Sequence, residues 1–211
     1  MHKAVMPIFP MGTISSYHFT GNTFDLDLLK DLPVRGPVGN ISTTQIGQTR
    51  NENILELTIF KNIKTFITNS VKHYLDSIDG VIYEDFWISS SWVNFCTTGG
   101  SQAVHNHGNS LVSGCFYIHA NAEHPGLYFK RPEFELQPYF VSQHREINPA
   151  RANEVEFKVS SNDLILFPSH LYHGHKLNPS TETRVGLAFN VLYNQPEDIM
   201  PAGWYHIRYE K

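Results

Sequence analysis

Three histidines are the residues in this chain best suited to chemistry. His105 and His107 stand at alternate positions of a run that has the composition of an extended strand. Residues i and i+2 of an extended chain point to the same side, so both imidazoles face one space and can bind one metal ion. His173 follows a second strand-like run, 163–167, and a proline. Two ligands on one strand and a third far downstream predict a mononuclear metal site.

A cation follows His173 on what is predicted to be the last strand of the same unit. Arg184 opens the run RVGLAFN, and alternation places Arg184, Gly186, Ala188 and Asn190 on one face of that strand. Gly186 and Ala188 leave room for a slender anion, and a guanidinium can hold a carboxylate through two parallel hydrogen bonds. For Arg184 considered alone, a surface ion pair with Glu182 is the alternative.

Three further polar residues are candidates for contact with a bound acid. Ser113 and Tyr117 share one face of the predicted strand 111–119, and Asn94 lies in the predicted strand 84–97. Hydroxyl and amide groups can donate hydrogen bonds to a carboxylate. A mixed polar and apolar barrel interior explains the same residues without a ligand, and both interpretations stay open at this point.

The elements that must position these residues are mainly β, with helices at the N-terminal end. Short strands broken by prolines are expected within 4–18, a helix within 24–32 capped by Thr23, and a loop over 34–51. Apolar residues at three- and four-residue spacing predict a helix over 53–79 that ends at Gly80 and packs on a sheet. Beyond it, strands are expected at 84–97, 111–119, 126–130, 155–159, 163–168, 184–193 and 204–209, with a long loop at 131–154. The pattern predicts a single domain, 1–211, in which 1–80 support an 81–211 double-sheet barrel or jelly roll.

The order of these motifs resembles that of the 2-oxoglutarate/Fe(II)-dependent oxygenases. The resemblance covers about residues 85–193, and this segment is most similar to one family of putative oxygenases with an H-x-H motif. Its motifs are Trp92/Asn94, His105/His107, Ser113-Gly114/Tyr117, Gly126/Phe129, Phe167-Pro168/His173 and Arg184/Phe189-Asn190. The resemblance implies a double-stranded β-helix (jelly roll) that binds Fe(II) and 2-oxoglutarate and oxidises a substrate. It also implies that His105 and His173 bind iron, that Arg184 holds the distal carboxylate of 2-oxoglutarate, and that Asn190 makes a second polar contact with it.

One position departs from the usual pattern of the superfamily. Most members have an acidic residue where this chain has His107, so a neutral imidazole replaces a carboxylate ligand. Three alternatives therefore stay open: a cupin-type metal protein, which is an isomerase or a dioxygenase that does not use 2-oxoglutarate, a barrel that binds metal without catalysis, and a zinc hydrolase. Arg184 on its Gly/Ala face favours the oxygenase, because a cupin has no need of it.

Composition limits the other function classes. The chain has 211 residues, 41% of them hydrophobic and 17% charged, and a net charge of −4. This balance argues against a nucleic-acid partner, and no apolar run is long enough to span a membrane. The two cysteines, Cys96 and Cys115, lie in strand-like runs and are expected to be free thiols, as in a cytoplasmic protein. We expect a small-molecule or peptide substrate, whose identity the sequence does not reveal, and a homodimer formed through exposed strand edges.

Overall fold

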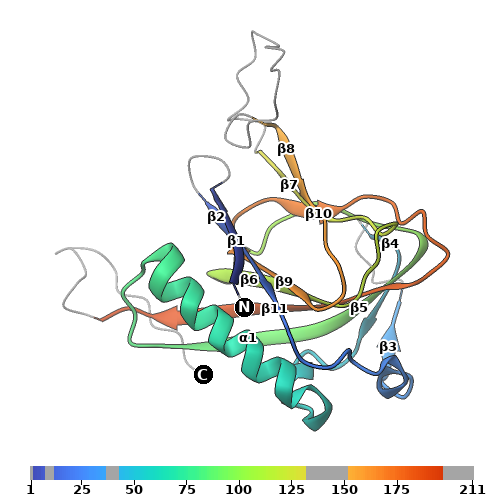
Figure 1. The fold of residues 1–211 in the computed structure, drawn as a ribbon, viewed down its shortest axis with the longest axis horizontal. Helices are drawn as coiled ribbons and strands as arrows, with labels where there is room; N and C mark the ends of the chain where they lie inside the picture. The colour runs from blue at the N-terminus through green and yellow to red at the C-terminus, as the bar shows by residue number, and fades with distance from the viewer. Residues whose placement is uncertain (1, 8–11, 37–42, 132–151, 197–211) are drawn as a thin grey trace, which may run out of the picture.

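The structure is a curled antiparallel β-sheet with one principal helix on its outer face (Figure 1). The computed structural model describes residues 2–7, 12–36, 43–131 and 152–196. Its strands are β1 (His2–Pro7), β2 (Thr13–His18), β3 (Val34–Arg35), β4 (Thr43–Thr49), β5 (Asp85–His105), β6 (Val112–His119), β7 (Leu127–Lys130), β8 (Glu154–Phe157), β9 (Asp163–Pro168), β10 (His173–His175) and β11 (Arg184–Asn194). Its helical segments are α1 (Lys61–His73), the 3-10 turns η1 (Leu26–Leu29), η2 (Ile54–Glu56) and η3 (Thr58–Phe60), and the π-helical turn η4 (Tyr74–Asp79). The predicted fold class, mainly β with helical support, is confirmed.

Strand β5 joins the two layers of the barrel. The strands are hydrogen-bonded in the order β1-β2-β9-β6-β11-β5-β10-β7-β8, with β4 on β5 and β3 on β4. The first part of β5 pairs with β11 as far as Cys96, and its last part pairs with β10 from Gln102 to His105. Between these parts lies Gly99, whose φ of +77° lies in the left-handed region that favours glycine. The change of partner carries the chain from one side of the barrel to the other.

Alternation along the central strands separates two cores. Phe116, Leu166 and Phe189 point to the outer face, where they are fully buried with the apolar residues of α1. Tyr117 and Phe167, the next residues along β6 and β9, point into the barrel. Burial of each large apolar side chain contributes about 1.5–3 kcal/mol, so this alternation fixes which face of each strand meets the helix. Figure 1 shows α1 across the layer of β9, β6 and β11, with β10, β7 and β8 on the opposite side.

The prediction of a helix over 53–79 is partly wrong in its extent, and its predicted packing on the sheet is confirmed. Leu57 is extended, with ψ of 138°, so η2 and η3 are separate turns and the α-helix begins only at Lys61. The backbone N–H of Leu55 donates to Oγ of Ser91 at 3.1 Å, a tertiary contact that competes with a continuous helix. The predicted end at Gly80 is confirmed by its left-handed conformation, and the helix packs on the sheet as expected.

The prediction of a loop over 34–51 is wrong, because the segment forms β3 and β4. Strand β4 pairs with β5 on both sides of Gly99, from Asn94 to Gln102. Its sequence, TTQIGQT, has only one large apolar residue, Ile46, which is buried. Backbone pairing with a long neighbouring strand therefore overrides a composition that is typical of loops.

The remaining elements match the predictions to different degrees. The strands predicted at 4–18, 111–119, 126–130, 155–159, 163–168 and 184–193 are present with end shifts of two residues or fewer, apart from the break between β1 and β2. The helix expected within 24–32 is reduced to η1, and its cap is Asp25 rather than Thr23. The strand predicted at 204–209, and all but the ends of the 131–154 loop, lie outside the described residues. No helix in the described ranges is long and apolar enough to cross a bilayer.

Candidate metal centre

His105 and His173 lie opposite each other on neighbouring strands. His105 is the last residue of β5, His173 is the first of β10, and the two are register partners. On its other side His173 pairs with Phe129 of β7, so β10 is held from both edges. His107 follows two residues after β5 ends. The pairing of β5 with β10 thus brings the distant third histidine to the H-x-H pair.

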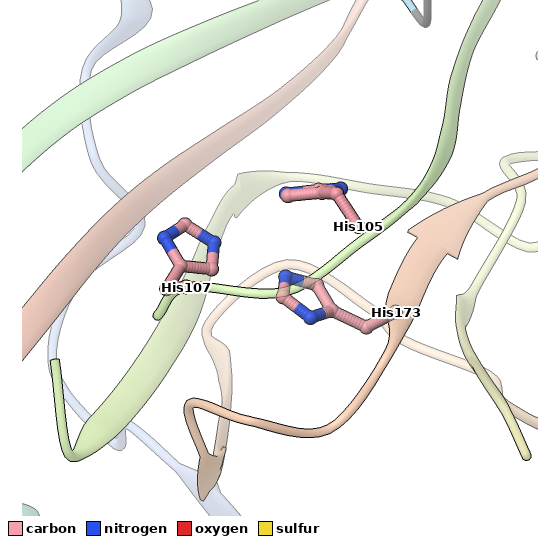
Figure 2. Close-up of side chains that lie close together, drawn as sticks. All are labelled: His105, His107 and His173. Carbon is pink, nitrogen blue, oxygen red and sulfur yellow. The ribbon is translucent and has the colours of Figure 1, made fainter. Parts of the chain in front are cut away.

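The three imidazoles turn toward one another and form one cluster (Figure 2). One potential ligand atom from each of His105, His107 and His173 lies within 4.8 Å of the others. The ring centroids are 4.5 Å apart for His105 and His173, and 5.1 and 5.2 Å apart for the two pairs that include His107. Metal–nitrogen bonds are about 2.1 Å long, so His105, His107 and His173 would hold an ion after a small movement of their rings toward one another.

Backbone carbonyls orient two of the three rings. Nδ1 of His105 donates to the carbonyl oxygen of Ala103 at 3.1 Å, and Nδ1 of His173 donates to that of Leu171 at 2.9 Å. A carbonyl oxygen only accepts, so each neutral ring carries its proton on Nδ1 and keeps the lone pair of Nε2. This is the usual second contact of a metal-binding histidine, and it leaves Nε2 as the ligand atom.

Burial keeps the cluster neutral. It lowers the pKa of His107 to about 4 and that of His173 to about 3, and it also lowers the pKa of His105. The mutual repulsion of the rings lowers the pKa values of His107 and His173 further. A metal ion binds the deprotonated imidazole, so no proton has to be displaced from these rings near neutral pH.

The turn after β9 fixes the segment that carries His107. The backbone N–H of His107 donates to the carbonyl oxygen of Ser169 at 2.9 Å, and the N–H of Ser169 donates to the carbonyl of Leu111 at 3.0 Å. The hydroxyl of Ser169 is bonded to those of Ser110 and Ser113, at 2.7 and 2.8 Å. Because Ser169 is fully buried, this hydroxyl chain holds the H-x-H segment against the end of β9.

A cavity of about 200 Å³ opens beside the three histidines. The predicted face of β11 forms its floor through Arg184, Gly186, Ala188 and Asn190. The opposite face of the strand packs on the helix side of the sheet, as alternation predicts. The cavity therefore joins the imidazole cluster to the cation that the sequence placed on the same floor.

Arg184 is a buried cation that has no acidic partner among the described residues. Its side chain is 5% exposed, one Nη donates to the hydroxyl of Tyr117 at 3.2 Å, and the guanidinium lies 4.8 Å from the centre of the Tyr117 ring. Its Nε is buried without a hydrogen-bond partner. Glu182, the alternative partner, is instead bonded to His119 at 2.8 Å. An unsatisfied buried donor of this kind costs about 1–3 kcal/mol unless a ligand accepts from it.

The other predicted contact residues lie around the same cavity, with different partners. Asn94 and Ser113 line it, and Tyr117 lies behind Arg184. Asn190 accepts a hydrogen bond from Ser113 at 2.9 Å and donates to Ser90 at 3.2 Å. Asn190 and Ser113 therefore satisfy each other, whereas no hydrogen bond of the Asn94 side chain exists within the described part of the chain.

Several lining residues escaped the sequence reasoning. Gln48 of β4 is the register partner of Asn94, and Gln102 of β5 is the partner of His175, which is buried and lines the cavity as well. Gln48 was missed because its segment reads as a loop. Gln102 was missed because the glycine pair before it suggested that the strand had ended, and its spacing of three residues from His105 does not place the two on one face of a regular strand.

Comparison with known proteins identifies the family and the fold. A family profile described as "Putative 2OG-Fe(II) oxygenase" matches residues 90–190. HygX from Streptomyces hygroscopicus, solved with nickel, 2-oxoglutarate and hygromycin B bound, has a TM-score of 0.59 at 11% identity over 92% of each chain. The viral collagen prolyl hydroxylase vCPH from Paramecium Bursaria Chlorella virus-1, solved as a 2-oxoglutarate complex, has a TM-score of 0.55 at 13% identity and covers 84% of this chain and 94% of its own. No curated protein matches the chain in sequence.

The match and the fold neighbours agree with the expected resemblance. The matched residues include the three clustered histidines, the floor of β11 and Arg184. The solved structures share the jelly-roll architecture with this chain, and at these identities the likeness is one of fold. Together the profile match and the shared fold support the assignment of the chain to the 2OG-Fe(II) oxygenase superfamily, whose members are oxidoreductases.

Proposed function

We propose that this oxygenase holds Fe(II) on His105, His107 and His173 and uses 2-oxoglutarate, bound to Arg184, as its cosubstrate. The observation that carries the proposal is the unpartnered, buried Nε of Arg184 in the same cavity as three converging imidazoles. A structural arginine at this position would be expected to have a carboxylate partner within the fold. A cosubstrate carboxylate supplies the missing acceptor.

The donor set fits a divalent first-row metal ion. Three neutral imidazoles offer nitrogen ligands, and two of them are already oriented by backbone carbonyls. Three protein ligands leave open positions on the metal, as a catalytic site requires. When bound, Fe(II) and 2-oxoglutarate together supply the activation of O2 that oxidises a substrate, with release of succinate and CO2.

The floor of the cavity fits a slender dicarboxylate. Gly186 has no side chain, and a Cβ there would lie 3.1 Å from Sγ of Cys115. Ala188 is the next residue on that face, so a thin molecule can lie between Arg184 and the histidines. Gln48 and Asn94 lie beside Gly186 in one row across β4, β5 and β11, where their amides can donate to a carboxylate.

Some residues of the cavity bind the cosubstrate, and others exclude water from it. Arg184 and the amides orient the cosubstrate, and Tyr117 holds the guanidinium in place through its hydroxyl and ring. Phe167 and Leu127 form apolar parts of the cavity wall. Low water content strengthens every polar contact inside the cavity and protects a reactive intermediate state from side reactions.

Calorimetric titration of 2-oxoglutarate into anaerobic, Fe(II)-loaded protein tests this function, with succinate as the matched control. We expect binding that requires both the metal and Arg184, because each end of the cosubstrate has its own anchor. Succinate lacks the 2-oxo group and is expected to bind more weakly. Retained metal without 2-oxoglutarate binding would refute the proposal and favour a cupin-type site.

A further inference from the structure

The side chains around the cavity carry an unusual charge for a metal site. None of the described residues that line it is aspartate or glutamate. Arg184 is a permanent cation, and it has no acidic partner in the described ranges. The four lining histidines are His105, His107, His173 and His175, and an imidazole that binds a metal ion does so as a neutral ligand. With neutral imidazoles, the described lining of the cavity therefore contributes one positive charge and no negative charge.

The charge of the loaded site follows from this count. A divalent metal ion adds two positive charges to that of Arg184, and 2-oxoglutarate brings two negative charges. One positive charge remains uncompensated. In a site with a carboxylate in place of His107 the same sum is zero, because the third ligand is an anion. The histidine at 107 thus leaves the loaded cavity one anion short.

A buried, uncompensated charge is costly and attracts an ion of opposite sign. Removing a single charge from water costs several kcal/mol even after the protein relaxes. The deficit lies on the metal side of the cavity, since Arg184 is already matched by the distal carboxylate. Trp92 lies there, with its ring stacked on His107 at a centroid distance of 6.3 Å. No hydrogen bond of the Trp92 side chain exists within the described ranges, and its indole N–H can donate to an anion.

On the basis of the proposed function, we propose that the substrate is a carboxylate-bearing monoanion that binds beside His107 and Trp92. The carboxylate neutralises the charge left by the His107 ligand, and the indole N–H of Trp92 donates to one of its oxygens. A neutral substrate of the same shape leaves the charge uncompensated. Charge therefore selects the substrate class at the entrance to the metal, separately from the recognition of 2-oxoglutarate at Arg184.

The test uses acetate as the anionic probe and acetamide as its neutral isostere. Both are titrated into anaerobic Fe(II)-loaded protein that is saturated with 2-oxoglutarate, so that Arg184 is already occupied. Visible absorption of the iron–cosubstrate complex reports binding without turnover. We expect acetate to bind at least about tenfold more tightly than acetamide, since tenfold corresponds to about 1.4 kcal/mol.

A pair of variants at the third ligand isolates the charge. His107→Asp and His107→Asn are nearly equal in shape and differ by one negative charge. We expect acetate affinity to fall at least about tenfold in His107→Asp relative to His107→Asn, with acetamide affinity changed less than about threefold. Trp92→Phe removes the indole N–H and is expected to weaken acetate without loss of metal. Should His107→Asp fail to fold or to hold iron, the comparison of acetate with acetamide in the wild-type protein still tests whether the site prefers an anion.

The outcomes separate this inference from the proposed function. Equal affinity for acetate and acetamide, or equal acetate affinity in the two variants, overturns the inference while leaving 2-oxoglutarate binding intact. Failure to bind 2-oxoglutarate overturns the proposed function and the inference with it. Preference for acetate that disappears in His107→Asp supports a monoanionic substrate.

Discussion

Replacement of Arg184 with methionine separates a ligand-binding arginine from a structural one. Methionine replaces the unbranched stem of the arginine side chain and removes the charged guanidinium. In the ligand-free protein Arg184 is 5% exposed, its Nε has no acceptor, and its guanidinium forms no ion pair within the described structure. A buried charge in that condition destabilises the fold, so its removal relieves a cost rather than breaking an ion pair.

Arg184→Met is expected to change the stability of the ligand-free protein little or favourably, and to weaken the binding of 2-oxoglutarate strongly. The variant loses the hydrogen bond to Tyr117 and the contact with its ring, which together contribute about 1–3 kcal/mol. Relief of the unpaired charge offsets this loss, because desolvation of an ion costs several kcal/mol. The free energy of unfolding of the ligand-free variant is therefore expected within about 1 kcal/mol of wild type, or above it. Two charge-assisted hydrogen bonds to a carboxylate contribute about 3 kcal/mol net, so Kd for 2-oxoglutarate rises by about two orders of magnitude.

Denaturant unfolding with and without 2-oxoglutarate, in metal-loaded protein, measures both quantities. In the wild type, saturating cosubstrate is expected to raise the unfolding midpoint, and in Arg184→Met this shift disappears. Arg184→Lys is the matched control, since it keeps the charge and loses the two-pronged geometry, and an intermediate Kd is expected. A ligand-free variant that is destabilised by more than about 3 kcal/mol, with the cosubstrate shift preserved, would contradict the assigned role.

Three further predictions concern the third ligand, the acid range and the cavity floor. His107→Ala is expected to lower iron content sharply, as measured by metal analysis after dialysis, and unchanged content would remove His107 from the ligand set. Metal-free protein is expected to lose stability as the pH falls from about 6.5 toward 5, by up to about 1.4 kcal/mol per pH unit for each buried histidine. Stability falls in this direction because burial lowers the pKa values of His107 and His173 in the folded state, so the unfolded chain takes up protons first. Urea unfolding at several pH values measures how the free energy of unfolding changes with pH. His107→Ala is expected to reduce that dependence. Gly186→Val places a side chain against Sγ of Cys115, and calorimetry is expected to show 2-oxoglutarate affinity at least about tenfold lower with iron content unchanged.

Local patterns in the sequence predicted the parts of the fold that depend on alternation. The two faces of β11 follow from period two alone, since Val185 and Leu187 are apolar while Gly186 and Ala188 are small. The same rule placed Ser113 and Tyr117 on the barrel side of β6. The packing of α1 on the outer face follows from its apolar spacing. Each of these features is set by neighbours along the chain, and a single sequence reveals it.

Features that depend on pairing between distant segments were not predictable in the same way. Strand β4 is strand only because the long edge of β5 satisfies its backbone, and its polar sequence carries no sign of that partner. For this reason the sequence did not predict that Gln48 lines the cavity. Strand β10 is three residues long, too short for any periodicity, and its existence depends on β5 and β7 on either side.

The course of β5 explains why the sequence indicated which three histidines cluster but not how the strands bring them together. Thr97-Thr98-Gly99-Gly100 reads as a turn that ends a strand, yet hydrogen bonding continues through it. Gly99 takes a positive φ, and a Cβ at Gly100 would lie 2.9 Å from the carbonyl oxygens of Gln45 and Thr97, so both positions need glycine to let the strand change partners. That change moves His105 from the β11 side of the barrel to the β10 side, opposite His173. The glycine pair therefore acts on the metal site from a distance, and a side chain at Gly100 is expected to disturb the cluster without touching any of its three imidazoles.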